Sequence, residues 1–326
     1  MLYKRILSGG HKMIDFYPEG RLINSTENKN YLKSFQGLLD AYNEHKILES
    51  KAIICDNEHN LVIDLGCIRG IILREEGAIG IKEGLIRDIA IISKVNRPVC
   101  FVITGFRKSL SGDNIPILSR RIAQEICMEN YIANLTPGDV IPAKVTHLEN
   151  FGAFVDIGCG IISFLPIDTI SVSRISHPNE RFYIGMDINV VVKFVENNRV
   201  HLTHKELLGT WEENAEMFSI GETVSGIVRS VEDYGIFVEL APNLAGLAEP
   251  CENVTQGMQV SVYIKNIVPD KMKIKLVIID TFENSNKCSN IKYFYNKNHI
   301  DRFTYSPQSS SKLIETDFTL AKQIQA

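Results

Sequence analysis

The sequence contains no apolar run of the roughly 20 residues that would be needed to cross a bilayer. Its first residues, MLYKRILSGGHKMIDF, lack the apolar stretch of a secretory signal, so we expect a cytoplasmic location. No phosphate-binding loop and no spacing typical of a Ser/His/Asp site is present. We therefore expect no enzymatic activity, no cofactor, no membrane partner and no small-molecule substrate.

Cysteine is scarce and scattered. The seven cysteines lie at positions 55, 67, 100, 127, 159, 251 and 288, and no two are within five residues of each other. This spacing argues against both a zinc site and a disulfide framework. Four of the eight histidines fall between residues 147 and 204, but no cysteine or carboxylate stands at ligand spacing beside them. We expect no metal site.

Positive charge is in slight deficit, since 35 Lys and Arg face 39 Asp and Glu, giving a formal net charge of −4. Binding to nucleic acid through phosphate contacts alone would need a basic excess. The charge is uneven, however, because residues 287–312 contain five basic side chains and a single acid. Local patches must therefore decide whether the chain binds a polyanion.

What the sequence does contain is one segment written twice. GDVIPAKVTHLENFGAFV starts at Gly138, and GETVSGIVRSVEDYGIFV starts 83 residues later at Gly221 and aligns with it without a gap. Each copy predicts a strand, a turn and then two rings separated by a glycine and one further residue. Two rings three positions apart around a glycine can be presented at one bend of a sheet. The rings are Phe151, Phe154, Tyr234 and Phe237.

Short strands dominate the rest of the pattern, which predicts a mainly β protein of three tandem five-stranded barrels joined by short helices. The expected strands of the two clear repeats are 139–147, 152–158, 161–165, 188–196 and 199–204, then 222–231, 235–240, 244–248, 259–268 and 272–279. Five strands with one long connection before the fourth are typical of an OB-type Greek-key barrel. In the first repeat that connection, 168–187, is polar enough to be surface.

The predicted organisation has seven parts. They are an N-terminal extension, partly helical (1–45), a degenerate barrel (46–124), a helical linker (125–137), a barrel (138–204), a second helical linker (205–220), a barrel (221–280) and a basic tail containing aromatic residues (281–326). Within the extension we expect a helix over 30–44. In the degenerate barrel we expect a hairpin formed by RDIAIISKV and RPVCFVITGF, with a closing strand at 115–119.

These motifs resemble the S-one domain, the OB-fold repeat named after the largest protein of the bacterial small ribosomal subunit. The resemblance rests on the gapless repeat, on both ring pairs, and on the closing strands with the patterns Arg-x-x-Leu-Thr and Lys-x-Lys-Leu. It covers about residues 46–280 as three domains and is strong in the second and third. The whole arrangement is similar to the short, three-repeat ribosomal-protein-S-one-like proteins of clostridial bacteria.

The resemblance implies binding of single-stranded RNA. The stacking aromatics of the family match Phe151 and Phe154, and Tyr234 and Phe237, while its basic residue on the final strand matches Arg199 and Lys273. Pro166 and Glu249 stand where the family often has a histidine. In the first domain both rings are missing, because His59, Asn60 and Val62 occupy the motif. We expect that domain to serve a structural or docking role.

Basic side chains near the final strands extend the predicted RNA contacts. Lys271, Lys273 and Lys275 alternate, so we expect them to share one face of a strand, with Lys265 on the neighbouring strand. An exposed lysine edge that protects the sheet is the alternative. In the middle domain Lys193, Arg199 and His201 are the candidates for the equivalent patch.

The tail IKYFYNKNHIDRFTY alternates aromatic, basic and polar residues. It can form either a small docked hairpin around residues 296–298 or an arm that orders on RNA or on a partner. Taken together, the sequence predicts a protein that binds single-stranded RNA, or mRNA, with weak sequence preference and works in translation at the small ribosomal subunit. A protein-docking adaptor, or an RNA-regulatory factor that is not stably part of the ribosome, is the alternative.

Overall fold

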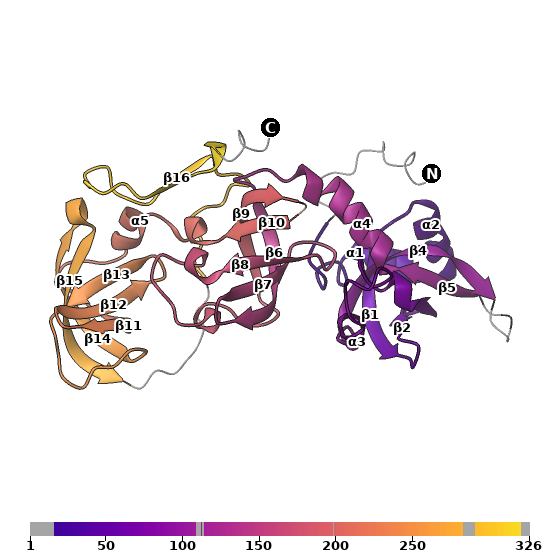
Figure 1. Ribbon diagram of the computed structural model, residues 1–326, viewed down its shortest axis with the longest axis horizontal. Coiled ribbons are helices and arrows are strands. Elements are labelled where there is room, and N and C mark those ends of the chain that lie inside the picture. The colour runs from indigo at the N-terminus through magenta and orange to yellow at the C-terminus, as the bar shows by residue number, and fades with distance from the viewer. Residues whose placement is uncertain (1–15, 109–111, 113, 198, 283–290, 321–326) are drawn as a thin grey trace. The chain divides into compact units, whose positions relative to one another are not determined.

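The computed structural model describes residues 16–108, 112, 114–197, 199–282 and 291–320 (Figure 1). Residues 1–15 of the predicted extension, together with Lys287 and Cys288 of the predicted tail, lie outside the described residues. Within the described ranges no helix is both long enough and apolar enough to span a membrane.

The strands form three closed five-stranded barrels, which confirms the predicted fold class. The first contains β1 (Leu48–Cys55), β2 (Leu61–Asp64), β3 (Arg69–Ile72), β4 (Pro98–Lys108) and β5 (Asn114–Ser119). The middle barrel contains β6 (Val140–Glu149), β7 (Gly152–Asp156), β8 (Ile162–Pro166), β9 (Asp187–Glu196) and β10 (Arg199–Thr203). The last contains β11 (Thr223–Glu232), β12 (Gly235–Ala241), β13 (Leu244–Ala248), β14 (Gln259–Val268) and β15 (Lys273–Phe282).

Each barrel closes in the same way. The third strand runs parallel to the fifth: β3 lies beside β5, β8 beside β10, and β13 beside β15. The other neighbouring strands whose register the structure describes run antiparallel. A short pair, β16 (Arg302–Thr304) and β17 (Glu315–Asp317), follows the last barrel. The barrel strands alternate buried and exposed side chains, as in β14 with Val260, Val262 and Ile264 inside, because one face of each strand lines a core.

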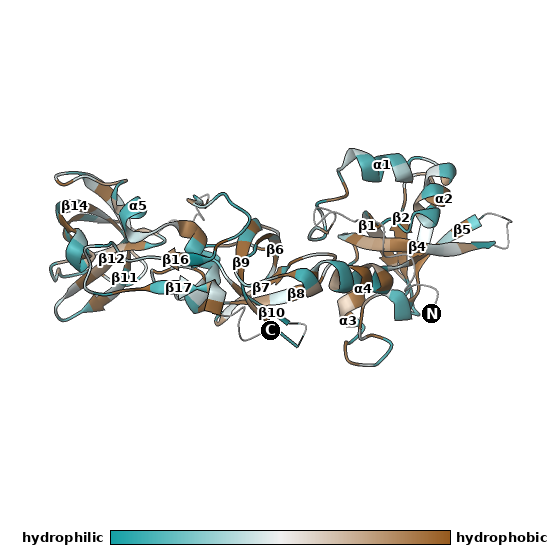
Figure 2. Cartoon of the chain, turned by 90° about the horizontal axis from the view of Figure 1, so that it is seen from above, coloured by the Kyte–Doolittle hydropathy of each residue, from teal (hydrophilic) through white to brown (hydrophobic). Residues whose placement is uncertain are grey.

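The helices are short. They are α1 (Thr26–Leu32), α2 (Phe35–Asn43), α3 (Ile89–Ile92), α4 (Arg120–Asn130) and α5 (Trp211–Ala215), with 3₁₀ turns at Arg74–Glu76, Ile132–Asn134, Ile167–Thr169, Pro178–Glu180, Lys205–Leu208 and Pro269–Lys271. Helices α1 and α2 precede the first barrel, α3 lies between β3 and β4, and α4 and α5 connect consecutive barrels in sequence. The helix expected over 30–44 is two helices, because the Ser34 hydroxyl accepts the N–H of Gly37 and starts a new one. Helix α4 carries both hydrophobic and hydrophilic residues (Figure 2).

The chain divides into two compact units. One comprises residues 1–134 with 156–162, and the other comprises residues 135–155 with 163–326. The finer seven-part division stays a prediction. In the first unit Leu38 and Ala41 of α2 join the core of the first barrel, so this part of the predicted extension is integral to the barrel.

The first strand of the hairpin predicted around residues 96–98 does not form. Residues 89–92 form α3 and are not a strand, and only β4 follows. Of the apolar side chains in α3, Ile91 is buried in the core of the first barrel, whereas Ile89 and Ile92 are exposed. The short apolar run was ambiguous between strand and helix because its length does not separate the two.

In the second unit, the connection over 168–187 is not simply surface. Ser171, Ser173, Arg181 and Phe182 are all buried, and the Ser173 N–H donates to the carbonyl of Pro242 in the last barrel (3.0 Å). The buried polar residues of the loop make hydrogen bonds in the interior, since buried polar groups need partners, whereas others such as Arg174 and Asn179 are exposed.

Candidate nucleic-acid interface

The two predicted ring pairs have the same geometry in the middle and last barrels. The rings of Phe151 and Phe154 are 6.3 Å apart at an interplanar angle of 89°, and those of Tyr234 and Phe237 are 6.1 Å apart at 87°. The first ring of each pair is largely in solvent, with exposed fractions of 57% for Phe151 and 68% for Tyr234. The second ring is half-buried. Each of these two barrels therefore presents an outer ring that is largely in solvent and a half-buried ring, here called the supported ring.

The glycine between the rings is required by a close approach of the neighbouring strand. A Cβ atom on Gly152 would lie 2.4 Å from the carbonyl oxygen of Leu165, and one on Gly235 would lie 2.6 Å from that of Ala248. Backbone carbonyls cannot move aside without breaking the sheet. Glycine therefore lets the second and third strands pack closely at the bend that carries the rings.

In the middle barrel the supported ring belongs to a row of four rings that crosses the strands. The Phe154 ring lies 5.3 Å from that of Phe164 on β8, whose register partner on β10 is His201. His201 is in turn the register partner of Phe194 on β9, and the two rings stack at 4.0 Å and 18°. Phe164 also lies 5.6 Å from Phe151. We call Phe154, Phe164, His201 and Phe194 the middle row.

The same register defines a row in the last barrel with different chemistry. Phe237 on β12 pairs with Leu247 on β13, Leu247 pairs with Lys275 on β15, and Lys275 pairs with Asn266 on β14. We call these residues the last row. It holds one ring and one positive charge where the middle row holds four rings. The middle row thus offers aromatic surface alone, whereas the last row offers one ring and one charged side chain.

In the first barrel the equivalent positions are Val62, Ile71, Ile117 and Gly105. All four are half-buried, so the row is accessible in part, yet it carries neither a ring nor a charge. The absence of rings predicted from sequence therefore extends across the whole row.

Two of the predicted lysines occupy equivalent bulges. The register between β9 and β10 skips Lys193, and that between β14 and β15 skips Lys265, so each lysine stands beside its row without a cross-strand partner in the ladder. Both are exposed. Lys265 lies 3.5 Å from Glu249, and because this ion pair is in solvent it contributes little.

The final strands place the remaining predicted residues. Arg199 and Lys273 are the first residues of β10 and β15, and both are exposed, so they are structurally equivalent. Lys275 shares a face with Lys273. The expectation that Lys271 lies on the same strand is wrong: it ends the 3₁₀ turn before β15, and Met272 with φ of 48° separates it from the strand.

Sequence reasoning missed Phe164 and Phe194. Neither lies in the repeated ring motif, and the last barrel has Leu247 and Asn266 at the corresponding places, so the repeat gave no signal for them. No local signal marks Phe194, because its pairing with His201 depends on the register between β9 and β10.

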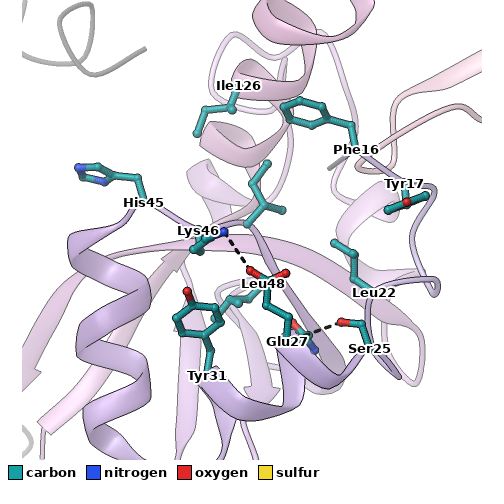
Figure 3. Close-up of a pocket in the computed structure, with 12 residues that line it drawn as sticks. Phe16, Tyr17, Leu22, Ser25, Glu27, Tyr31, His45, Lys46, Leu48 and Ile126 are labelled. Carbon is teal, nitrogen blue, oxygen red and sulfur yellow. Dashed lines mark hydrogen bonds and ion pairs between the residues drawn. The ribbon is translucent and has the colours of Figure 1, made fainter. Parts of the chain in front are cut away.

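A cavity of about 280 Å³ lies in the first unit, and none of the predicted contact residues lines it (Figure 3). It is lined by α1, by the start of β1 and by Ile126 of α4, and its rim carries an ion pair between Lys46 and Glu27 (2.9 Å). Among the described residues, no group of three His, Cys, Asp or Glu side chains is placed to hold a metal ion.

Comparison with known proteins finds the S1 RNA binding domain family at residues 134–205, which confirms the S-one resemblance for the middle barrel. Curated relatives include the small ribosomal subunit protein bS1 of Rhizobium meliloti, 30% identical over 189 residues, and that of Staphylococcus epidermidis, 33% identical over 192 residues. These matches cover 52% and 53% of this chain, and 33% and 49% of the relatives. The chain spans about half the length of the curated relatives it matches, or less.

Among solved structures, a multidomain protein with nucleic acid binding domains from Streptococcus pneumoniae matches at 13% identity, covering 72% of this chain and 74% of that one. Its TM-score is 0.24, so no further conclusion is drawn from that likeness.

Proposed function

We propose that the middle and last barrels bind single-stranded RNA, with mRNA at the small ribosomal subunit as the setting. The recurrence of the perpendicular ring pair, with its outer ring in solvent in both barrels, is the observation that carries this proposal. The match to the S1 RNA binding domain and the likeness to small ribosomal subunit proteins support it.

Stacking supplies most of the binding free energy in this proposal. One base on an aromatic ring contributes roughly 1–3 kcal/mol, so two outer rings with their supporting rings offset the absence of a basic excess in the chain. Every base has a flat face, so the sequence preference should be weak. Lys193, Lys265, Arg199, Lys273 and Lys275 contact phosphates beside the rings.

The test is an anisotropy titration of labelled, unstructured single-stranded RNA with the full chain, repeated with an RNA duplex. The double variant Phe151→Ala/Tyr234→Ala should bind single strands at least about tenfold more weakly, since it removes roughly 1 kcal/mol or more of stacking in each barrel. Its thermal unfolding midpoint should stay unchanged, because both rings are largely in solvent.

Tyr183→Ala is the matched control. Tyr183 is an aromatic residue of the middle barrel region with an exposed fraction of 59%, and it lies outside the ring pair and the middle row. Equal loss of binding in control and double variant would contradict the assignment of the rings. A well-folded wild-type chain that binds no RNA at micromolar concentration would point instead to the protein-docking alternative.

A further inference from the structure

Residues 291–318, here called the strap, fold back onto both ring-bearing barrels of the second unit (Figure 1). The sequence leaves two forms open for this tail, a small hairpin around residues 296–298 or an arm that orders on RNA or on a partner. The hairpin does not form, because this stretch pairs with the start of β6. The Val140 N–H donates to the carbonyl of Asn298 (2.9 Å), and the Ile300 N–H donates to that of Gly138 (2.8 Å). The strap therefore meets the start of β6 through an isolated antiparallel bridge between Asp139 and His299.

Apolar side chains fix the same part of the strap. Ile300 and Phe318 are buried with Val191 and Leu207 of the middle barrel region in one cluster. At the edge of this cluster Tyr293 accepts a backbone N–H from β9 through its hydroxyl oxygen (3.0 Å). The aromatic and apolar residues of the tail are thus directed at the barrel, and they are not presented as an open arm.

The strap reaches the last barrel through Tyr305. This side chain is buried in the core of the last barrel, and its hydroxyl donates to the carbonyl of Asn243 (2.6 Å). The Tyr305 carbonyl accepts the N–H of Trp211 in the helix between the two barrels (3.0 Å). Phe303, two residues earlier, packs against the apolar clusters of both barrels.

Asn243 joins the two barrels directly as well. Its side chain is fully buried, accepts the N–H of Val172 (3.0 Å), and donates to the carbonyls of Lys205 and Gly209 (2.8 Å each). All three partners belong to the segment between the third strand of the middle barrel and α5. One amide therefore satisfies backbone groups that would otherwise be buried without partners.

A buried ionic network lies at the same junction. Glu239 on β12 accepts hydrogen bonds from Arg181 of the long loop and from Arg229 on β11 (2.6 Å each), and Arg229 also bonds Glu180. Burial lowers the pKa of Arg181 despite the facing Glu239 carboxylate. Opposite charges that are desolvated together hold a fixed geometry, because separating them would leave a buried charge unpaired.

We propose that the strap, together with the buried junction formed by Asn243 and Glu239, locks the two ring-bearing barrels into one rigid platform that binds a single continuous strand of RNA. This inference rests on the proposed function. When two barrels are linked flexibly, RNA bound to one barrel binds the second with an effective concentration that the linker limits. Barrels held in one orientation have already lost that freedom, so a strand long enough to reach both ring pairs gains the full second contact.

Rigidity is tested without RNA and without mutation. Residual dipolar couplings of methyl groups in the middle and last barrels of the wild-type full chain should fit one alignment tensor. Two different tensors would overturn the proposal whatever the RNA measurements show.

The variant Tyr293→Ala/Ile300→Ala/Asn243→Ala removes the anchor of the strap on the middle barrel and the buried amide that joins the two barrels directly, while leaving the ring pairs and both rows unchanged. Leu313→Ala is the matched control, since Leu313 lies in the strap with an exposed fraction of 66%. RNAs of about 6 and about 24 nucleotides bracket the site size of one barrel, which is roughly 4–16 nucleotides. For the variant we expect two tensors, about tenfold weaker binding of the long RNA, and unchanged binding of the short RNA.

The outcomes separate the two proposals. If the wild type binds no RNA of either length, the proposed function fails. The dipolar couplings alone then decide whether the two barrels are held rigidly. If both RNAs bind the wild type equally well, or if the variant binds the long RNA as the wild type does, RNA binding stands and the rigid platform is rejected. If the variant does not fold, the wild-type couplings and the wild-type length dependence still decide.

Discussion

At the scale of single residues, the ring motif was predictable and the residues around it were not. Phe151 and Tyr234 could be predicted from the repeat. In each copy the ring is followed by a glycine that a carbonyl of the neighbouring strand requires, so the motif can be recognised in the local sequence. Phe164 joins them only through the pairing of β8 with β7 and β10, which no local pattern encodes. Cross-strand neighbours are set by register, and register depends on the closed barrel.

The middle and last rows differ at Phe164 and Leu247, which makes a reciprocal exchange informative. Phe164→Leu should weaken binding of single-stranded RNA severalfold, by roughly 1 kcal/mol, because one ring of the stacking surface is lost. Leu247→Phe should strengthen it by a similar factor. Both exchanges keep a large apolar side chain at a half-buried position, so thermal unfolding should change little.

The measurement is anisotropy titration of each variant and of the double exchange. An unchanged affinity in Phe164→Leu would mean that RNA does not reach the middle row beyond the first ring pair.

His204 predicts a pH dependence of stability in the second unit. Burial lowers its pKa to about 4, against a smaller opposing effect of the carbonyl of Ile170, to which Nδ1–H donates (2.8 Å). The other ring nitrogen then accepts from the hydroxyl of Tyr293 (3.3 Å). Between pH 6.5 and about 4 the unfolded chain takes up a proton that the folded chain refuses, so stability falls as the pH falls through this window.

The loss attributable to His204 is up to about 3 kcal/mol. Comparing urea unfolding of the wild type and of His204→Gln at pH 7.5, 6 and 5 isolates it, since all other titrating groups are shared. We expect the variant to be less stable at pH 7.5 but to lose less on acidification. Parallel pH profiles would contradict a neutral, buried His204.

At the scale of elements, the strands of the middle and last barrels were predicted to within three residues at each end, whereas the connections were predicted less well. The alternation over 259–268 is governed by one lined face, and β14 has these same limits. The loop over 168–187 misled because serine and arginine on a loop normally indicate solvent, yet Ser173 and Arg181 bond to groups of the last barrel. A pattern of apolar residues predicts which side chains face a core, but it does not predict which polar side chains are buried at the junction between two barrels.

Asn243 gives this junction a measurable contribution. Asn243→Ala leaves one backbone N–H and two carbonyls buried without their partner, so we expect a loss of at least about 2 kcal/mol in the free energy of unfolding of the second unit. Asn266→Ala, at an exposed position of β14, should change it by less than about 0.5 kcal/mol. Chemical denaturation followed by Trp211 fluorescence measures the loss of unfolding free energy in both variants. Equal losses would contradict a stabilising role of Asn243 at the junction.

Strand β15 and bulge residue Lys265 should control the salt dependence of RNA binding. Each lost phosphate contact reduces the slope of log affinity against log salt by about 0.7 for single strands. The variant Lys265→Gln/Lys273→Gln/Lys275→Gln should therefore lower the slope by about 2, whereas Phe151→Ala should weaken binding at every salt concentration and leave the slope unchanged. Titrations between 50 and 300 mM salt distinguish the two classes, and an unaltered slope in the triple variant would mean that these lysines only protect the sheet.

At the scale of the whole molecule, three barrels with one architecture carry three different rows. The number of barrels was predictable because closed barrels of about five short strands repeat along the chain, even where the ring motif is lost. The strap was not predictable, because its aromatic and basic residues suit contact with RNA and contact with a barrel equally well. The burial of Ile300 and Phe318 against the middle barrel, and of Tyr305 in the core of the last barrel, distinguishes them.

The difference between the rows predicts which parts of the full chain touch RNA. Ultraviolet crosslinking to a uridine-rich single strand, followed by mass spectrometry, should place crosslinked peptides in residues 138–204 and 221–280. None is expected from the strands of the first barrel, because Val62, Ile71, Ile117 and Gly105 offer neither a ring for stacking nor a charge for phosphate. Crosslinks on β2 or β5 would show that backbone groups and shape suffice for binding there, and the row would then lose its value as the marker of an RNA-binding barrel.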